Sequence, residues 1–110
     1  MELLIIVLNN EEYLDEILTL MIAQEIIGIG ILESTRVEQT LSAHIPIFAG
    51  LFKTMSDMRP FQKIILGLAP SKKNILLFTK ELKKSNIDFS NLENGFLLSI
   101  TLSSYLGEPL

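Results

Sequence analysis

The chain has no cysteine, no tryptophan and one histidine, and its Lys and Arg residues are few, nine against thirteen Asp and Glu in 110 residues. The lack of cysteine excludes disulfides, thiolate metal sites and cysteine nucleophiles. The formal net charge of −4 argues against duplex binding, because phosphate contacts need clustered Lys and Arg. We therefore expect no nucleic-acid partner.

A membrane-spanning run is also missing. The apolar run at residues 3–8 is far too short to cross a bilayer, and Glu2 precedes it where a signal peptide would be basic. We expect a cytoplasmic protein without membrane insertion. Hydrophobic residues nevertheless make up 48% of the chain, so some apolar surface is expected to meet another subunit.

The first half of the chain predicts a strand, a helix and a second strand. The apolar run 3–8 fits a strand buried on both faces. Asn9, with Glu12 three residues later, is typical of a helix N-terminus, and the helix is expected to fade near residues 26–27. Residues 28–34 then indicate a strand. The inner face of the helix is predicted to consist of Leu14, Ile17, Leu18 and Met21.

The second half repeats this order after a central segment, residues 36–60. Residues 61–69 alternate as a strand does, and Ser71 is the expected N-cap of a second helix. Asn94-Gly95 is a strong turn signal before a last strand at residues 96–102. The inner face of the second helix is predicted to consist of Ile75, Phe78 and Leu82.

This order is typical of an α+β ferredoxin-like sandwich, in which a four-stranded antiparallel sheet carries two helices on one face. Residues 1–110 are predicted to form this single domain. The first strand is apolar on both faces, and in the third strand Ile65 lies opposite Ile64 and Leu66. The sheet face left uncovered by the helices is therefore expected to be buried too, and we infer an oligomer that packs through it.

The central segment is more apolar than a loop exposed to solvent. Apolar positions four residues apart after Pro46 favour a short helix. Two interpretations stay open: a hydrophobic docking surface for a partner protein, or a clasp that adds core between subunits. The residues concerned are Ile45, Ile47, Phe48, Leu51, Phe52 and Met55.

Charged residues offer few further sites. His44, with Glu38 as the nearest carboxylate in sequence, makes no metal site within one chain, although a threefold axis could gather three copies. Lys63 and Arg59 flank the third strand, where they either meet an anion or pair with acidic surface residues.

Lys72 and Lys73 stand at the end of the second helix where its dipole disfavours cations. They are either solvated or in contact with an anion.

The topology, the helix spacing and the stretch Gly-Ile-Gly-Ile-Leu-Glu at residues 28–33, which leads into a long central segment, resemble the nitrogen regulatory protein PII superfamily. The resemblance implies a homotrimeric, cytoplasmic signal-transduction protein. In that family a long loop docks on enzymes, transporters or transcription regulators, and an adenine nucleotide binds in the clefts between subunits. A CutA-like trimer without a nucleotide ligand is an alternative within the wider superfamily.

Several departures from the family bear on the nucleotide. Typical members follow the second strand with Gly-Phe-Gly-Arg-Gln, whereas residues 36–40 read Arg-Val-Glu-Gln-Thr. A family Gly-Lys pair is Gly95-Phe96 here, and two family arginines correspond to Ser103 and Tyr105, although residues 107–108, Gly-Glu, fit the family ending.

Because charge-assisted contacts are the strong ones, these losses make ATP doubtful. They leave an adenine nucleotide of lower charge, another small metabolite, or a cleft that binds nothing. The effector-cleft candidates are Ser34, Thr35, Arg36, Lys63, Asn94, Gly95 and Tyr105.

Catalysis is not expected, because no serine has a histidine at a motif spacing and no paired carboxylates stand out. The acylphosphatase version of this sandwich needs an arginine in a glycine-rich loop where residues 9–11 are Asn, Asn and Glu. An ACT-type small-ligand module, which pairs side by side, is the second functional hypothesis. The first is a PII-like regulator that senses a small molecule between subunits and controls a partner protein through the central segment.

Overall fold

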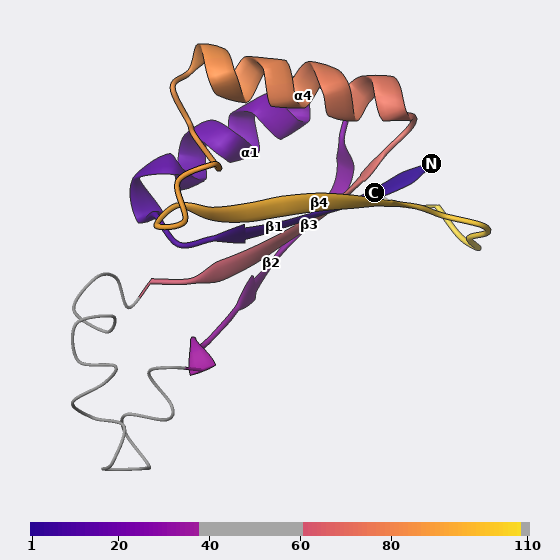
Figure 1. Ribbon diagram of the computed structural model, residues 1–110. Coiled ribbons are helices and arrows are strands. Elements are labelled where there is room, and N and C mark those ends of the chain that lie inside the picture. The colour runs from indigo at the N-terminus through magenta and orange to yellow at the C-terminus, as the bar shows by residue number, and fades with distance from the viewer. Residues whose placement is uncertain (38–60, 109–110) are drawn as a thin grey trace.

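The computed structural model describes residues 1–37 and 61–108, which form a four-stranded antiparallel sheet with two α-helices on one face (Figure 1). The predicted α+β ferredoxin-like arrangement is confirmed. The predicted short helix after Pro46, the six apolar docking candidates, His44 and Arg59 lie outside the described residues. The elements are β1 (Glu2–Leu8), a 3-10 turn η1 (Glu11–Tyr13), α1 (Leu14–Ala23), β2 (Ile27–Glu33), β3 (Lys63–Ala69), α4 (Lys72–Lys84) and β4 (Gly95–Thr101).

The strand order in the sheet is β2-β3-β1-β4, so β1 lies between two strands that are distant in sequence. At one end of the sheet Leu8 stands opposite both Lys63 and Gly95. At the other end Glu2 stands opposite Ala69 and Thr101. Because β1 pairs over its whole length on both sides, its register fixes which residues share each face of the sheet.

The hydrophobic core lies between the helices and the sheet face beneath them. Alternate residues of β1 are buried there, as expected from the period of a strand. The predicted inner faces of both helices are confirmed, with Leu14 and Leu18 partly buried at the margin of the core. The buried apolar side chains are Leu4, Ile6, Leu8, Ile65 and Ala69 from the sheet, Ile17 and Met21 from α1, Ile75, Phe78 and Leu82 from α4, and Ile26 and Ile87, which follow the two helices.

The N-terminus of α1 differs from the prediction. Asn10, not Asn9, caps the 3-10 turn η1 that leads into α1, because its Oδ1 accepts a hydrogen bond from the backbone N–H of Glu12 at 3.1 Å. The N-cap residue of α1 itself is Tyr13, which makes no side-chain capping bond. Asn9 still belongs to the end of the sheet, where its Oδ1 accepts from Nε2 of Gln62 at 2.9 Å. The chain therefore leaves the sheet one residue later than predicted, and the first helical turn begins after Asn10 instead of after Asn9.

Both helices end in the same hydrogen-bond pattern. After α1 the N–H of Ile26 donates to the carbonyl of Met21, and after α4 the N–H of Ile87 donates to that of Leu82. The residues before them, Glu25 and Asn86, have φ values of 63° and 60°. This is a Schellman ending, in which the next apolar residue packs on the helix. It stops α1 at Ala23, earlier than predicted, without the glycine that normally signals such a stop.

Candidate functional site

The sheet face turned away from the helices is apolar at every paired position that the structure describes. We call this surface the open face. Phe96, Ile100 and Leu32 on it are 53%, 50% and 52% exposed. Monomeric proteins rarely leave such a contiguous patch uncovered. From the strand register the open face consists of Leu3, Ile5 and Val7; Ile64, Leu66 and Leu68; Phe96, Leu98 and Ile100; and Ile27, Gly30 and Leu32.

A polar cluster closes one end of the sheet, where β1 and β2 end and β3 and β4 begin. We call it the sheet-end cluster: Ser34, Gln62, Asn9, Asn10 and Asn94. Oγ of Ser34 donates to Oε1 of Gln62 at 2.6 Å, and Nε2 of Gln62 donates to Oδ1 of Asn9 at 2.9 Å. A chain of hydrogen bonds thus links the end of β2, the approach to β3 and the end of β1.

Asn94 extends the cluster toward β4. Its backbone carbonyl accepts from the N–H of Asn9 at 3.0 Å, and its Oδ1 accepts from Nδ2 of Asn10 at 3.1 Å. Its own Nδ2 donates to the carbonyl of Asp88 at 2.7 Å. Asn9, Asn10 and Asn94 are all less than a tenth exposed, so hydrogen bonds within the protein replace bonds to water in this cluster.

Glycine is the only residue that fits at position 95, directly after the sheet-end cluster residue Asn94. The φ of Gly95 is +109°, and a Cβ built on it would lie 1.9 Å from the backbone carbonyl oxygen of Val7. Only glycine tolerates both the conformation and the contact. The Asn94-Gly95 turn signal therefore marks the position at which β4 passes close to β1.

Lys63 stands at the same end but is already engaged. Its Nζ lies 3.5 Å from Oε1 of Glu33 on the neighbouring strand and 5.5 Å from the ring centroid of Phe61. Of the two interpretations left open for Lys63, the structure shows the pairing with an acidic surface residue. Because Glu33 is well exposed, this pair contributes little to stability and leaves the ammonium able to change partner.

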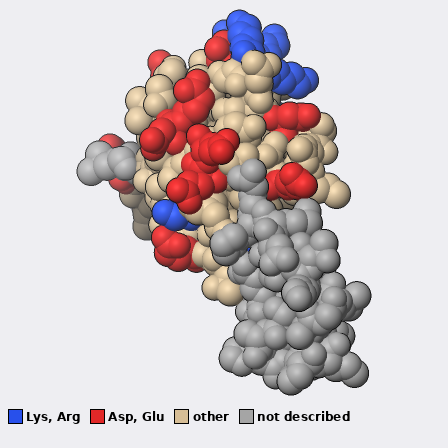
Figure 2. All heavy atoms as spheres, turned by 90° about the vertical axis from the view of Figure 1, so that its left-hand side faces the viewer, with Lys and Arg blue, Asp and Glu red and all other residues tan. Residues whose placement is uncertain are grey.

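Acidic side chains dominate the described surface at the side where α1 begins, whereas the basic side chains gather mainly at one edge (Figure 2). Glu11 and Glu12 in η1, with Asp15 and Glu16 in the first turn of α1, belong to this acidic side. A negative field of this kind opposes the approach of a polyanion such as a nucleoside triphosphate.

The structure brings together most of the predicted effector-cleft residues. Ser34, Lys63, Asn94 and Gly95 lie at the same end of the sheet, and Thr35 and Arg36 continue the chain from the end of β2. Tyr105 does not join them within one chain: it follows β4 at the opposite end, beside Leu68. Its place in a cleft between subunits stays a prediction.

The sequence does not predict three members of the sheet-end cluster: Asn9, Asn10 and Gln62. The pattern favours Asn9 as a helix cap, and Gln62 carries no signal because it is a lone glutamine within the predicted strand at residues 61–69. Only the pairing of β1 with β3 brings the amides of Asn9 and Gln62 into contact. The run Asn9-Asn10 directly after a buried strand does indicate a turn at this place, since asparagine is favoured in turns.

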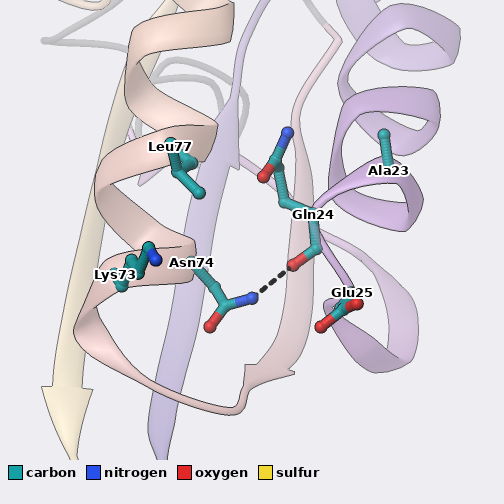
Figure 3. Close-up of a pocket in the computed structure, with 6 residues that line it drawn as sticks. All are labelled: Ala23, Gln24, Glu25, Lys73, Asn74 and Leu77. Atoms are coloured by element: carbon teal, nitrogen blue, oxygen red, sulfur yellow. Dashed lines mark hydrogen bonds between the residues drawn. The ribbon is translucent and has the colours of Figure 1, made fainter.

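A third feature is a hollow of about 340 Å³ between the end of α1 and the start of α4. Figure 3 shows Asn74 reaching across it to the backbone of Gln24, where Nδ2 donates to the carbonyl oxygen at 2.9 Å. This bond satisfies a carbonyl at the C-terminus of α1. We interpret the hollow as a tie between the helices. Its lining consists of Ala23, Gln24, Glu25, Lys73, Asn74 and Leu77.

In residues 1–37 and 61–108 no three His, Cys, Asp or Glu side chains gather as metal ligands would. Neither α1 nor α4 has the length and apolar composition that crossing a membrane requires.

No protein-family model matches the chain, and no curated protein matches it either. The relation to the PII superfamily therefore remains a prediction from the order and spacing of the elements.

Proposed function

We propose that this chain is a PII-like regulatory subunit that assembles through its open face, binds a small molecule of low charge next to the sheet-end cluster, and controls a partner protein through the central segment. The observation that carries the proposal is the open face. The subunit is not proposed to be an enzyme.

The open face supports self-assembly because of its size and uniformity. It extends over all four strands without a polar side chain at any paired position, whereas surfaces that stay in water mix polar and apolar groups. Burying apolar area at about 25 cal/mol per Å² favours association once the patch is larger than the few hundred Å² common on monomers.

Face packing accounts for the open face better than side-by-side pairing does. In an ACT-type arrangement the edge strands or helices pair, and the sheet is extended without covering either of its faces. Leu3, Ile5 and Val7 lie on β1 in the interior of the sheet, so pairing at an edge would leave them in water. We therefore prefer a trimer packed through the faces, with the ACT-type dimer as the second candidate.

The sheet-end cluster supports a neutral or weakly charged effector. Its members supply amide and hydroxyl groups, which bind by neutral hydrogen bonds. Gln62, for example, bonds to both Ser34 and Asn9 in this way. The acidic surface around the cluster adds a penalty for each phosphate charge, which favours a nucleoside or its monophosphate over ATP.

The assignment of partner docking to the central segment rests on its sequence. Apolar side chains from Ile45 to Met55 would form a surface suited to a partner protein. Deleting residues 45–55 should abolish binding of a protein that co-purifies with the native subunit and leave the oligomer intact. A smaller oligomer after the deletion would assign the segment to the intersubunit core.

Light scattering after gel filtration tests the assembly. We expect three times the chain mass of 12.4 kDa. Leu98→Glu, which places a charge on the open face, should reduce the mass to that of one chain. Ile22→Glu is the matched control, because Ile22 is an exposed apolar residue on the helical side and its replacement should leave the mass unchanged.

A monomer at every concentration, or equal effects of the two glutamates, would contradict assembly through the open face. A dimer insensitive to Leu98→Glu would support the ACT-type arrangement.

Thermal melting with adenosine, AMP and ATP tests the effector. We expect adenosine or AMP to raise the melting temperature more than ATP does, and Gln62→Ala to remove the shift by breaking the hydrogen bonds to Ser34 and Asn9. An intact trimer that none of the three ligands stabilises would instead support a CutA-like subunit without a nucleotide.

A further inference from the structure

A buried carboxylate lies at the other end of the sheet from the sheet-end cluster. Glu2 is only 4% exposed and faces the helices. Both of its carboxylate oxygens lie 3.0 Å from the Oγ of Thr101 on the neighbouring strand. A hydroxyl has one proton, so it donates to one of these oxygens at a time. The carboxylate therefore retains acceptor capacity that Thr101 does not fill.

This carboxylate lines a cavity of about 370 Å³ between the sheet and the start of α4. In Figure 1 the N-terminus lies beside the end of α4 at which that helix begins. The volume is within the range of small-molecule pockets, at its lower end. We call this cavity the N-terminal pocket; its lining residues are Glu2, Lys72, Ile75, Leu76, Ser99 and Thr101.

The two charges of the N-terminal pocket do not neutralise each other. Lys72 and Glu2 both line it, yet among the ion pairs of the described residues there is none between them. Lys72 is the first residue of α4, where the helix dipole already disfavours a cation. A negative group placed beside Lys72 and a positive group placed beside Glu2 would each relieve an unfavourable charge.

The other residues of the N-terminal pocket form one polar wall and one apolar wall. Ser99 offers a hydroxyl on the sheet side, next in register to Thr101 on the same face of β4. Ile75 and Leu76 on α4 offer an apolar wall, on which Leu76 is well exposed. A suitable ligand thus has an ammonium group, a carboxylate group and a short hydrocarbon chain.

We propose that the N-terminal pocket binds a small zwitterionic amino carboxylate. Its ammonium donates to the Glu2 carboxylate and the Ser99 hydroxyl, its carboxylate lies beside Lys72 and the first turn of α4, and its hydrocarbon chain packs on Ile75 and Leu76. The proposal is independent of assembly through the open face and of the effector at the sheet-end cluster, because the pocket lies at the opposite end of the sheet and on its helical side.

Titration of the ¹⁵N-labelled protein followed by NMR tests this proposal with three matched probes. Norleucine carries both charged groups, pentylamine lacks the carboxylate and hexanoate lacks the ammonium. We expect norleucine to shift the amide signals of Lys72, Ser99 and Thr101 saturably, pentylamine to bind more weakly, and hexanoate to bind most weakly because the buried carboxylate repels it.

Substitutions separate the two charges. Glu2→Gln should weaken norleucine binding at least about tenfold, because a charge-assisted hydrogen bond is lost. Lys72→Met should weaken norleucine while leaving pentylamine unchanged or tighter. Lys73→Met is the control, since Lys73 lines the hollow between the helices instead, and it should change neither.

The proposal is overturned if norleucine produces no saturable shift at Ser99 and Thr101, or if Glu2→Gln binds it as the natural protein does. Equal effects of Lys72→Met and Lys73→Met would also overturn it, because they would indicate diffuse attraction. If Glu2→Gln fails to fold, Lys72→Met tests the proposal instead, because Lys72 is exposed and its substitution should not disturb folding. This variant should lower the ratio of norleucine affinity to pentylamine affinity, and an unchanged ratio would overturn the proposal.

Discussion

The two faces of β1 are both apolar along residues 3–8 but differ in what covers them. On one face Leu4, Ile6 and Leu8 are completely buried beneath α1 and α4. On the other, the intervening residues of the same strand, Leu3, Ile5 and Val7, are only half-buried. Among the described residues α1 and α4 cover only the first of these faces, and the proposed assembly through the open face follows from this difference.

The two faces of the sheet also differ in how closely their glycines are packed and in where their polar residues lie. Gly95 is locked against the backbone of Val7, whereas a Cβ on Gly30, which belongs to the open face, would meet no atom within 4 Å. Polar groups gather at the two ends of the sheet and on its helical side, at Glu2, Ser99 and Thr101. Close contacts therefore restrict which residues fit on the helical side, whereas the open face requires mainly that its residues be apolar.

The largest expected effect is on unfolding free energy, and it should differ between alanine substitutions at two neighbouring positions of β1. Ile6→Ala, on the helical side, should cost about 2–5 kcal/mol of unfolding free energy because it leaves a cavity in a closed core. Ile5→Ala should cost less at low protein concentration and more as the concentration rises, because copies of the chain then cover it. Urea unfolding at several concentrations measures both. Loss of the concentration dependence for Ile5→Ala would remove the contrast between the faces.

Next in size is a pair of glycine substitutions. Gly95→Ala combines a positive φ with a backbone collision and should cost about 2–4 kcal/mol. Gly30→Ala should be neutral or stabilise an isolated subunit slightly, since alanine restricts the unfolded chain. Thermal melting of the two variants compares them. Similar destabilisation by both would show that the open face is packed as closely as the helical side.

An intermediate effect is expected at the sheet-end cluster. Asn94→Ala removes the side-chain hydrogen bonds to Asn10 and Asp88 and leaves buried groups without partners, which should cost about 1–3 kcal/mol. Asn91→Ala is the control: its Oδ1 accepts only the exposed N–H of Glu93. Chemical denaturation distinguishes the two, and equal losses would mean that the cluster is not a buried unit.

The smallest effect concerns Asp88, on the exposed loop before β4. The hydroxyl of Ser90, at 2.6 Å, and then its backbone N–H, at 2.9 Å, hold the pKa of Asp88 below its ordinary value. The sign follows from linkage: the contribution to stability is present above the ordinary pKa of aspartate and is lost as the pH falls through the lowered pKa. NMR titration should show the lowered pKa, and Ser90→Ala should bring it back toward the ordinary value. An unchanged pKa in that variant would refute the role of the hydroxyl.

Periodicity predicted most of the fold because it reports burial directly. The inner faces of both helices and the two faces of β3 follow from spacing alone. Local hydrogen bonds were harder to predict. Ser71 is the N-cap residue of α4 as predicted, but its hydroxyl donates to Oδ1 of Asn74 and makes no capping bond to a backbone N–H.

The candidate site was predictable only in part, because its contacts cross the sheet. Ser34, Lys63 and Asn94 were singled out through a family resemblance, and the strand register brings them to one end. Gln62 and Glu2 had no local signal, since their importance depends on partners far away in the sequence. The central segment stays a prediction in full.

The position of β1 between β3 and β4 also has a consequence for folding. Glu2 and Thr101 pair although they lie 99 positions apart in the sequence, so β1, an interior strand of the sheet, cannot complete its pairing until β4 has been synthesised. Chains rich in such distant contacts fold slowly, because the entropy of closing large loops is lost before the contacts form. Until β4 pairs with it, β1 is an apolar strand with one unpaired edge. The chain is therefore most prone to aggregation before β4 has been synthesised.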